Sequence, residues 1–213
     1  MKVGIIGSGS VGQTLAKKFI DLGHSVTIGT RSPEKLTEWA SQTGVTVGSF
    51  ADAAAFGEII VLATQWAGGA TENALSLADP ANFVGKTVID VTNPLDFSTG
   101  VLRLDIGHTD SAGEAIQRCL PGAKVVKALN IVTAATMVNP SYAGGDPDMF
   151  IGGDDEGAKQ QVTQILHDFG WKGVIDLGGL ETARYLEPLA LIWCLQFFKT
   201  RNDRLAFKMV GQS

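Results

Sequence analysis

The run Gly7-Ser8-Gly9-Ser10-Val11-Gly12 has the clearest binding chemistry in the sequence, because its glycines have the spacing GxGxxG. The run follows a predicted strand, Lys2–Ile6, and opens a segment with helical apolar spacing, which is the context in which this pattern binds a dinucleotide. In such a turn Gly7 permits the tight bend, Gly9 lets a pyrophosphate approach the backbone, and Gly12 lets helix and strand pack closely. The free N–H groups of the helix N-terminus then face the phosphates. We therefore predict that all six residues of the run bind a dinucleotide.

The residues after the second predicted strand, Ser25–Ile28, indicate which dinucleotide is bound. An NAD-binding turn usually carries a carboxylate there for the ribose 2′-hydroxyl, whereas this chain has Gly29 and then Thr30-Arg31-Ser32, and its first carboxylate is Glu34. The planar Arg31 guanidinium suits a 2′-phosphate, and the two neighbouring hydroxyls can donate to it. Lys35, in the first turn of the next helix, adds a second positive charge. This pattern predicts a preference for NADP(H), bound by Thr30, Arg31, Ser32 and Lys35.

Short apolar runs alternate with helical patterns along the chain, which predicts a parallel sheet with helices on both faces. Ligands of such a sheet collect beyond the carboxyl ends of its strands. Trp66 would wall the nicotinamide pocket or belong to the core, and Pro94 would fix the chain beside the ring or form a simple turn. Asn93 and Asn130 would hold polar atoms of the carboxamide or substrate, unless they are plain turn residues. The segments that follow the predicted strands, and so are candidates for this site, are Ala63-Thr64-Gln65-Trp66, Thr92-Asn93-Pro94-Leu95, Lys127-Ala128-Leu129-Asn130 and Gly152-Gly153.

No acid–base pair stands out among these segments. Lys127 is a possible proton donor to a carbonyl or imine, or else a structural residue. The histidines are isolated from one another and from cysteine, so we expect no metal site, and no GxSxG elbow or paired cysteine indicates a nucleophile. Hydride transfer between two bound heterocycles depends on alignment more than on a protein acid. A site poor in acid–base residues therefore fits a flavin-like acceptor better than a simple ketone.

The elements that must position these residues describe an α/β, doubly wound Rossmann fold with a mostly parallel sheet and a small C-terminal helical segment. We expect residues 1–153 to form the NADP-binding domain, and residues 154–213 to extend the sheet and add helices over a second site. Pro188 is expected to kink or break the last helical stretch. The expected strands are Lys2–Ile6, Ser25–Ile28, Thr46–Val47, Glu58–Ala63, Thr87–Val91, Lys124–Ala128, Asp148–Ile151 and Gly173–Asp176. The expected helices run from Ser10 to Gly23, onward from Ser32-Pro33, over Asp52–Phe56, from Ser111 to Cys119, over Thr133–Val138, from Asp154 to Phe169, and over residues 180–200.

These motifs together resemble the coenzyme F420-dependent NADP oxidoreductase family. The resemblance implies hydride transfer between NADP(H) and a deazaflavin that lies against the nicotinamide, under the C-terminal helices. It also implies that Thr30, Arg31 and Lys35 match the positions that hold the 2′-phosphate, and that the protein is a homodimer. Two other functions stay open: an NADPH-dependent reductase of a carbonyl, imine, flavin or metal chelate, and a non-catalytic NADP(H)-binding regulator. The resemblance is carried by Gly7–Gly12, Gly29–Ser32 with Lys35, Asp90–Leu95, Val125–Asn130, Met149–Asp154 and Gly178-Gly179.

The composition limits the classes of partner that the protein can bind. The formal net charge is -5 and no Lys/Arg run stands out, which argues against nucleic acid or an anionic membrane as a partner. Two distant cysteines, Cys119 and Cys194, and the absence of a long apolar run fit a cytoplasmic protein that acts on small-molecule cofactor substrates. Apolar residues make up 45% of the chain and charged ones only 18%, so part of the apolar surface is expected in an oligomer contact. An apolar stripe late in the chain would serve as core, as dimer contact or as a roof over the second cofactor, and consists of Leu186, Leu189, Trp193, Phe197 and Phe198.

Overall fold

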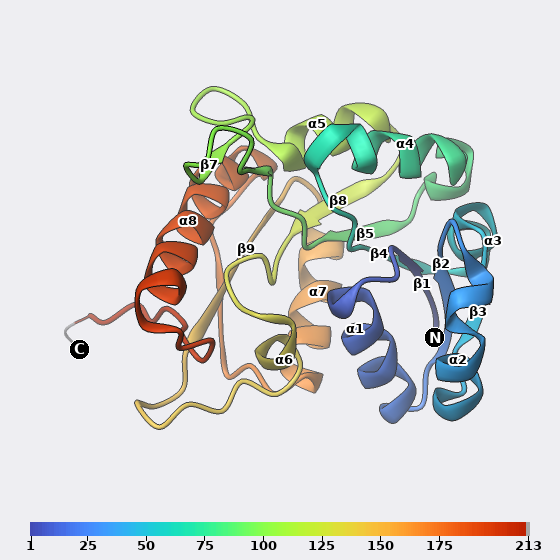
Figure 1. The fold of residues 1–213 in the computed structure, drawn as a ribbon, viewed down its shortest axis with the longest axis horizontal. Helices are drawn as coiled ribbons and strands as arrows, with labels where there is room; N and C mark the ends of the chain where they lie inside the picture. The colour runs from blue at the N-terminus through green and yellow to red at the C-terminus, as the bar shows by residue number, and fades with distance from the viewer. Residues whose placement is uncertain (212–213) are drawn as a thin grey trace.

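An eight-stranded sheet forms the centre of the computed structural model, which describes residues 1–211 (Figure 1). The strand order is β10-β9-β8-β5-β4-β1-β2-β3. The chain therefore builds outward from β1 in one direction and then returns to place β4 on its other side. Between β1 and β4 the order reverses, which is where an open α/β sheet binds its ligand. The strands of this sheet are β1 Lys2–Ile6, β2 Ser25–Gly29, β3 Thr46–Gly48, β4 Ile59–Leu62, β5 Thr87–Asp90, β8 Lys124–Lys127, β9 Asp148–Gly153 and β10 Gly173–Asp176.

Alternate side chains of the central strands point to opposite faces of the sheet, and each face has its own apolar core. In β4, Ile59 and Val61 belong to the first core, whereas Ile60 and Leu62 belong to the second. The first core includes side chains of α1 (Ser10–Asp21) and α7 (Glu156–Asp168), which lie below the sheet in Figure 1. The second core includes α3 (Phe50–Phe56), α4 (Ala70–Leu77) and α5 (Ala112–Cys119). Helices cover both faces, so the predicted doubly wound α/β fold is confirmed.

Strand β9 runs against the direction of β8, and this bears on one expectation about the site. Gly153 pairs with Val126, and Gly152 with Lys127, in an antiparallel register. Between the two strands the only described helix is α6 (Ala134–Met137), which is too short for the crossover that a parallel connection needs. The carboxyl end of β9 consequently points away from the edge at which β1, β4, β5 and β8 end. Gly152 nevertheless lies opposite Lys127, the last residue of β8, so Gly152-Gly153 stays beside that edge while the chain after β9 leaves it.

Local signals set the helix starts, and some differ from the expected ones. Ser49 and Asp52 form a reciprocal capping box, so α3 begins at Phe50, two residues before the expected start. The Ser111 side chain accepts from the N–H of Glu114, as its capping pattern predicts. Ser32 caps nothing with its side chain: residues Pro33–Leu36 form a 3-10 turn (η1), and α2 follows at Thr37–Thr43. Helix α4 was not expected. Short 3-10 turns also occur at Ala67–Gly69 (η2), Pro80–Phe83 (η3) and Leu180–Thr182 (η4).

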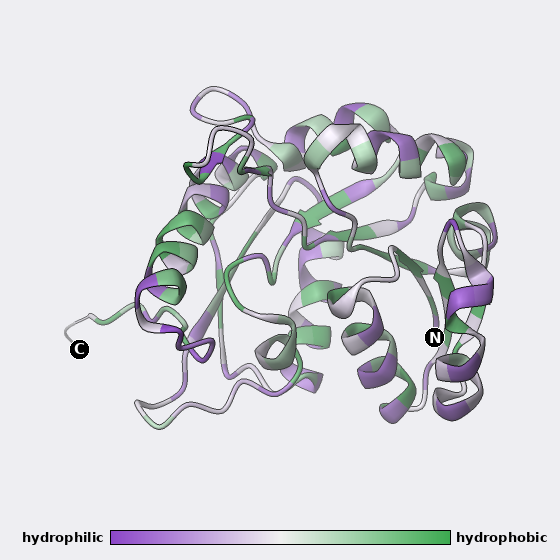
Figure 2. Cartoon of the chain, viewed as in Figure 1, coloured by the Kyte–Doolittle hydropathy of each residue, from purple (hydrophilic) through white to green (hydrophobic). Residues whose placement is uncertain are grey.

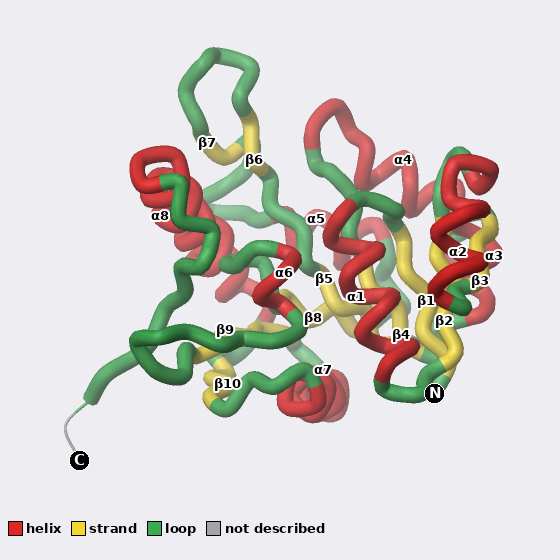
Figure 3. The backbone as a smooth tube through the Cα atoms, turned by 60° about the horizontal axis from the view of Figure 1, so that its bottom comes forward, coloured by secondary structure: helices red, strands yellow, loops and turns green. Residues whose placement is uncertain are grey.

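The C-terminal part closes over the β8–β9 side of the sheet. Pro188 lies inside α8 (Ala183–Thr200) without ending it, so the stretch is one helix. A small hairpin, β6 (Leu95–Asp96) with β7 (Arg103–Leu104), projects from the body beside α8 (Figure 3). Its Phe97 ring packs edge-on against Phe198 of α8, with ring centroids 6.1 Å apart. None of the helices within residues 1–211 has the length and apolarity of a membrane-spanning segment.

Candidate functional site

The turn after β1 is built from glycines with three different constraints. Gly7 has φ +116°, and a side chain there would collide with the carbonyl of Ala63. A side chain at Gly12 would collide with the Gly7 carbonyl, so this glycine lets α1 approach the turn. A Cβ at Gly9, by contrast, would meet no atom of the described chain within 4 Å. Gly7 and Gly12 are therefore required by packing, whereas the open side of Gly9 faces space that a ligand can use.

The N-terminus of α1 starts in this turn. Gly9 is the N-cap residue, and it offers no side chain to the first N–H groups of the helix. The first turn carries no acidic residue. The end of the helix dipole and the free N–H groups therefore favour an anion, which is the arrangement that binds a pyrophosphate.

A hydroxyl contact joins this turn to the one after β2. The Ser8 hydroxyl donates to the Thr30 hydroxyl at 2.9 Å, and the backbone N–H of Ser32 donates to the same Thr30 oxygen at 3.3 Å. The salt bridges among residues 1–211 leave the exposed side chains of Arg31 and Lys35 unpaired. Both cations are thus free to bind a phosphate group.

These segments surround a cleft of about 320 Å³. The described residues that line it include two cations but no carboxylate and no histidine, although the whole chain is acidic. The cleft brings together most of the predicted cofactor-binding residues: Gly7, Ser8, Gly9, Thr30, Arg31, Ser32, Lys35, Ala63 and Thr64. The donor set fits the phosphates of NADP(H), since fixed N–H groups, hydroxyls and cations are all donors to phosphate oxygens.

Other predicted residues of the turn lie behind the cleft or beside it. Gly12 is buried under the turn, and Val11 packs against the first core. Ser10 faces a separate surface groove that also contains Gln13 and Lys17. The cleft has four lining residues that were not predicted: Phe50, Ala70, Asn73 and Ala74. Three of them lie on α4, whose signal was Glu72 in a first turn followed by apolar residues at 74, 75 and 78.

Trp66 and Pro94 are held in the protein body and do not line the cleft. Trp66 is 8% exposed, belongs to the second core, and donates its indole N–H to Asp105 at 2.9 Å. Pro94 is buried, and its carbonyl accepts the N–H of Asp105 at 2.8 Å. Asp105 therefore fastens the segment after β7 to the ends of both β4 and β5.

The Asn93 and Asn130 side chains meet at the carboxyl ends of β5 and β8. The Asn93 amide donates to the Asn130 carbonyl at 2.7 Å, and the Asn130 amide donates to the Asn93 side-chain oxygen at 2.9 Å. A second N–H of Asn130 donates to the Leu186 carbonyl of α8 at 2.9 Å. Within residues 1–211, Asn130 Oδ1 is the buried side-chain oxygen or nitrogen that has no hydrogen-bond partner. A buried acceptor of this kind is costly unless a donor reaches it.

Lys127 is not placed to donate a proton to a substrate, contrary to its candidacy as a catalytic acid. Its side chain is 0% exposed, and its ammonium group contacts Asp90 Oδ2 at 2.9 Å, the Thr92 carbonyl at 2.7 Å and Glu187 Oε1 at 2.8 Å. Burial alone would lower the pKa of Lys127, but Asp90 and Glu187 outweigh it and the pKa is raised. The three donors of the ammonium are all in use, so the lysine stays charged.

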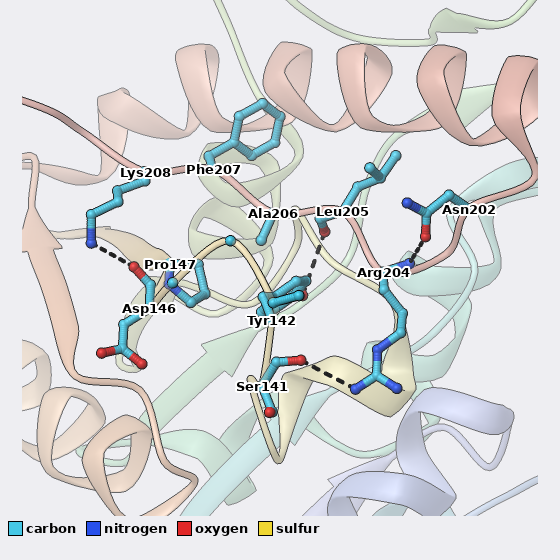
Figure 4. A pocket seen from close by; sticks show the side chains of 13 residues that line it. Ser141, Tyr142, Asp146, Pro147, Asn202, Arg204, Leu205, Ala206, Phe207 and Lys208 are labelled. Atoms are coloured by element: carbon cyan, nitrogen blue, oxygen red, sulfur yellow. Dashed lines mark hydrogen bonds between the residues drawn. The ribbon is translucent and has the colours of Figure 1, made fainter.

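A larger hollow of about 780 Å³ lies away from these strand ends, between the loop of residues 141–147 and the segment after α8 (Figure 4). The Arg204 guanidinium donates to the Ser141 carbonyl at 3.2 Å, and the Lys208 ammonium donates to the Asp146 carbonyl at 2.6 Å. Phe207 accepts the N–H of Asp148 at 2.9 Å. The cations of this hollow thus already bind backbone carbonyls, and they fix the C-terminal segment beside β9.

Comparison with known proteins agrees with this geometry. The family model described as "NADP oxidoreductase coenzyme F420-dependent" matches residues 2–94. A solved structure from Arthrobacter sp. FB24, provisionally named an F420-dependent NADP-reductase, is 42% identical, with a TM-score of 0.94 over 99% of this chain and 100% of that chain. This chain belongs to the coenzyme F420-dependent NADP oxidoreductase family. It is therefore a member of a family of NADP-dependent oxidoreductases with a Rossmann-type α/β fold.

Two further relatives of this chain differ in length. The F420-dependent NADP reductase of Methanothermobacter thermautotrophicus is 29% identical over 204 residues, which cover 89% of this chain and 86% of that protein. Metalloreductase STEAP3 of Rattus norvegicus is 31% identical over 193 residues, 89% of this chain but only 36% of that protein. The chain thus spans about a third of the length of the metalloreductases it matches.

Proposed function

We propose that this protein transfers a hydride between NADP(H) and coenzyme F420. The observation that carries the proposal is the cleft between the turns after β1 and β2, in which Arg31 and Lys35 lie beside the hydroxyls of Thr30 and Ser32. A 2′-phosphate needs cations and donors at this position, and a carboxylate would repel it. Relatives named for F420-dependent NADP reduction support the choice of acceptor.

Different residues of the open cleft bind different parts of the nucleotide in this proposal. The space beside Gly9 admits the pyrophosphate to the first N–H groups of α1. Arg31 and Lys35 bind the 2′-phosphate together with the hydroxyls of Thr30 and Ser32. Ser8 donates to Thr30 and so fixes the direction of its hydroxyl. Ser10, Val11 and Gly12 act indirectly, by forming the first turn of α1.

The residues at the carboxyl ends of β5 and β8 orient the reacting groups in this proposal. Bound NADPH supplies the hydride. Asn130 Oδ1 has a free acceptor position, which suits an amide N–H such as that of the nicotinamide carboxamide. Asn93 fixes the direction of the Asn130 side chain, and Pro94 and Trp66 support the surrounding turns. Reduction of the acceptor takes up one proton besides the hydride, and water would supply that proton, so the site needs no protein acid.

The C-terminal part belongs to the same proposal. Residues 1–153 bind the nucleotide, and residues 154–213, of which 212–213 lie outside the described residues, cover the second substrate. One face of α8 exposes apolar side chains at helical spacing, among them Tyr185 (72%), Ile192 (52%) and Leu195 (59%). Figure 2 shows apolar residues in green along much of this helix. We propose that this face is the contact of a homodimer, so Leu195→Glu should give a monomer in light scattering.

The second candidate function is the reduction of a flavin or metal chelate. It is favoured by the likeness to the metalloreductases, which extends over most of this chain. Such a protein would use the same NADP(H) cleft but would present the nicotinamide to a different acceptor.

An absorbance assay with NADPH and oxidised F420 tests the proposal. Rapid loss of the deazaflavin absorbance, much slower with NADH, is the expected result. A parallel assay replaces F420 by FAD and a ferric chelate, and turnover there alone would favour the second candidate. Tight NADPH binding without turnover of any acceptor, including carbonyls and imines, would indicate a regulator and would contradict both.

A further inference from the structure

A buried cluster of charges connects α8 to the ends of β5 and β8. Lys127 of β8 lies between Asp90 of β5 and Glu187 of α8, and all three side chains are at most 1% exposed. The Glu187 carboxylate also accepts two backbone N–H groups from the first turn of α5, those of Ala112 at 3.0 Å and Gly113 at 3.1 Å. One glutamate thus joins three elements in the interior.

The cluster fixes the turn that carries Asn93. Asp90 Oδ1 accepts from the N–H of Thr92 at 2.9 Å and from its hydroxyl at 2.7 Å, while Lys127 donates to the Thr92 carbonyl at 2.7 Å. Every polar group of Thr92 is therefore tied to the cluster. The next residue, Asn93, contacts Asn130, and Asn130 contacts the carbonyl of Leu186, which directly precedes Glu187.

Two carboxylates share one buried ammonium group in this cluster, so Glu187 depends most on its other partners. Lys127 and Asp90 alone form a neutral pair, so Glu187 adds a buried negative charge that the N-terminus of α5 compensates. A buried carboxylate is costly to keep unless all its partners are in place. The first turns of α8 are consequently locked at one distance from the Asn93–Asn130 pair.

We infer that Glu187 is a positioning residue, which acts through Lys127 to hold the Asn93–Asn130 pair at the geometry required for hydride transfer. This inference rests on the proposed function. It separates binding from chemistry: the open cleft sets nucleotide affinity, whereas Glu187 sets the rate at which bound nucleotide reacts. A misplacement of about 1 Å at a reacting centre can cost on the order of 100-fold in rate.

The test compares Glu187→Gln with a control carboxylate of another lysine pair, Asp176→Asn, whose side chain is 43% exposed. Asp176 pairs with Lys159 at 2.8 Å, as Glu187 pairs with Lys127, and Lys159 is also nearly buried. The control pair lies on α7 and β10, and β10 is the edge strand at the opposite end of the strand order from β1 and β2. NADPH affinity is measured by nicotinamide fluorescence titration, and hydride transfer to F420 by stopped-flow absorbance at saturating nucleotide, using the full chain.

Glu187→Gln should transfer the hydride roughly 10- to 100-fold more slowly, with the Kd for NADPH within about twofold of the parent value. Asp176→Asn should match the parent in both. A second variant, Glu187→Asp, keeps the charge with a shorter reach and should give an intermediate rate; it also replaces Glu187→Gln if that variant does not fold. A parent-like rate in the glutamate variants would overturn the inference. So would a loss of rate and affinity in equal proportion to the fraction of folded protein.

If the parent protein does not reduce F420, the proposed function fails and a separate readout decides the inference. The emission of the nicotinamide ring of bound NADPH reports its surroundings without any acceptor. A changed emission in Glu187→Gln, with parent-like emission in Asp176→Asn, supports positioning by Glu187. Identical emission from all three proteins overturns it.

Discussion

The two halves of the sheet edge treat polar groups in opposite ways. Around β1, β2 and β4, cations and hydroxyls face an open cleft, and Arg31 and Lys35 have no ion-pair partner among residues 1–211. Around β5 and β8, Asp90 and Lys127 are buried and paired with each other. We call the ends of β1, β2 and β4 the open half, because its polar groups can take their partners from a ligand. We call the ends of β5 and β8 the closed half, because its charged groups pair with one another. We therefore expect the first to control nucleotide affinity, and the second to control geometry and stability.

Removing the cation from the closed half should have the largest effect. Lys127→Met leaves Asp90 and Glu187 buried without their counter-charge, which we expect to lower the free energy of unfolding by about 3–5 kcal/mol. Lys159→Met is the matched substitution, but there the partners Glu156 and Asp176 are 76% and 43% exposed, so its loss should stay near or below about 1 kcal/mol. Urea unfolding of both variants measures the difference. Equal losses would mean that burial does not distinguish the two lysines.

The glycines of the open half should separate binding from folding. At Gly9 the backbone has φ −71°, and an added Cβ meets no atom of the chain, so Gly9→Val should fold normally. The valine would occupy the space that the pyrophosphate needs, and NADPH affinity should fall at least about 100-fold, or ~2.8 kcal/mol. Isothermal titration gives the affinity and thermal unfolding the stability.

Gly12 is the control for that experiment. A Cβ at Gly12 collides with the Gly7 carbonyl, so Gly12→Ala should lower the melting temperature as well as the affinity. A Gly9→Val protein that keeps its affinity for NADPH would show that the nucleotide does not approach this turn.

A charge reversal at the cleft should alter nucleotide choice more than affinity in general. Arg31→Glu places a carboxylate where the 2′-phosphate is expected to lie, and should weaken NADPH binding roughly 10- to 100-fold, about 1.4–2.8 kcal/mol. NADH lacks that phosphate, so its Kd should change little. The ratio of the two constants is the measurement, and losses of equal size would contradict the role of Arg31.

The open half could be predicted from the sequence because its chemistry is local. Gly7–Gly12 and Thr30–Lys35 are continuous segments, and a turn between a strand and a helix fixes where their backbone groups point. The pairing of Ser8 with Thr30 follows once β1 and β2 are neighbours. The cleft residues on α4 were missed because a single short amphipathic helix gives a weak pattern.

The closed half could not be predicted, because its partners are far apart in the chain. Lys127 contacts Asp90, which is 37 residues away, and Glu187, which lies on a helix that follows the last strand of the sheet in the sequence. Nothing local distinguishes a lysine that donates to a substrate from one that donates to buried carboxylates. Similarly, the indole of Trp66 is held by Asp105, across 39 residues. The reversal of β9 goes with a connection, residues 128–147, whose only described helix is α6.

The smallest expected effect concerns the surface of the closed half, where Glu114 of α5 binds Arg184 of α8. The Arg184 Nε donates to Glu114 Oε2 at 2.8 Å, and the hydrogen bonds from Arg184 hold the pKa of this carboxyl below its ordinary value near 4.5. A depressed folded-state pKa contributes stability above the unfolded-state value, and this contribution is lost as the pH falls through the folded-state pKa. Glu114→Gln should therefore destabilise the protein at neutral pH, by less than about 1 kcal/mol because solvent screens the pair. Urea unfolding at pH 7 and again in acid, about one unit below the ordinary carboxyl value, should show the two proteins converging as Glu114 is protonated. Glu114 and Arg184 do not line the cleft that contains Arg31 and Lys35, so NADPH binding by the open half should show no matching difference between the two proteins. A gap in stability that persists unchanged in acid would mean that shape, and not charge, holds α5 to α8.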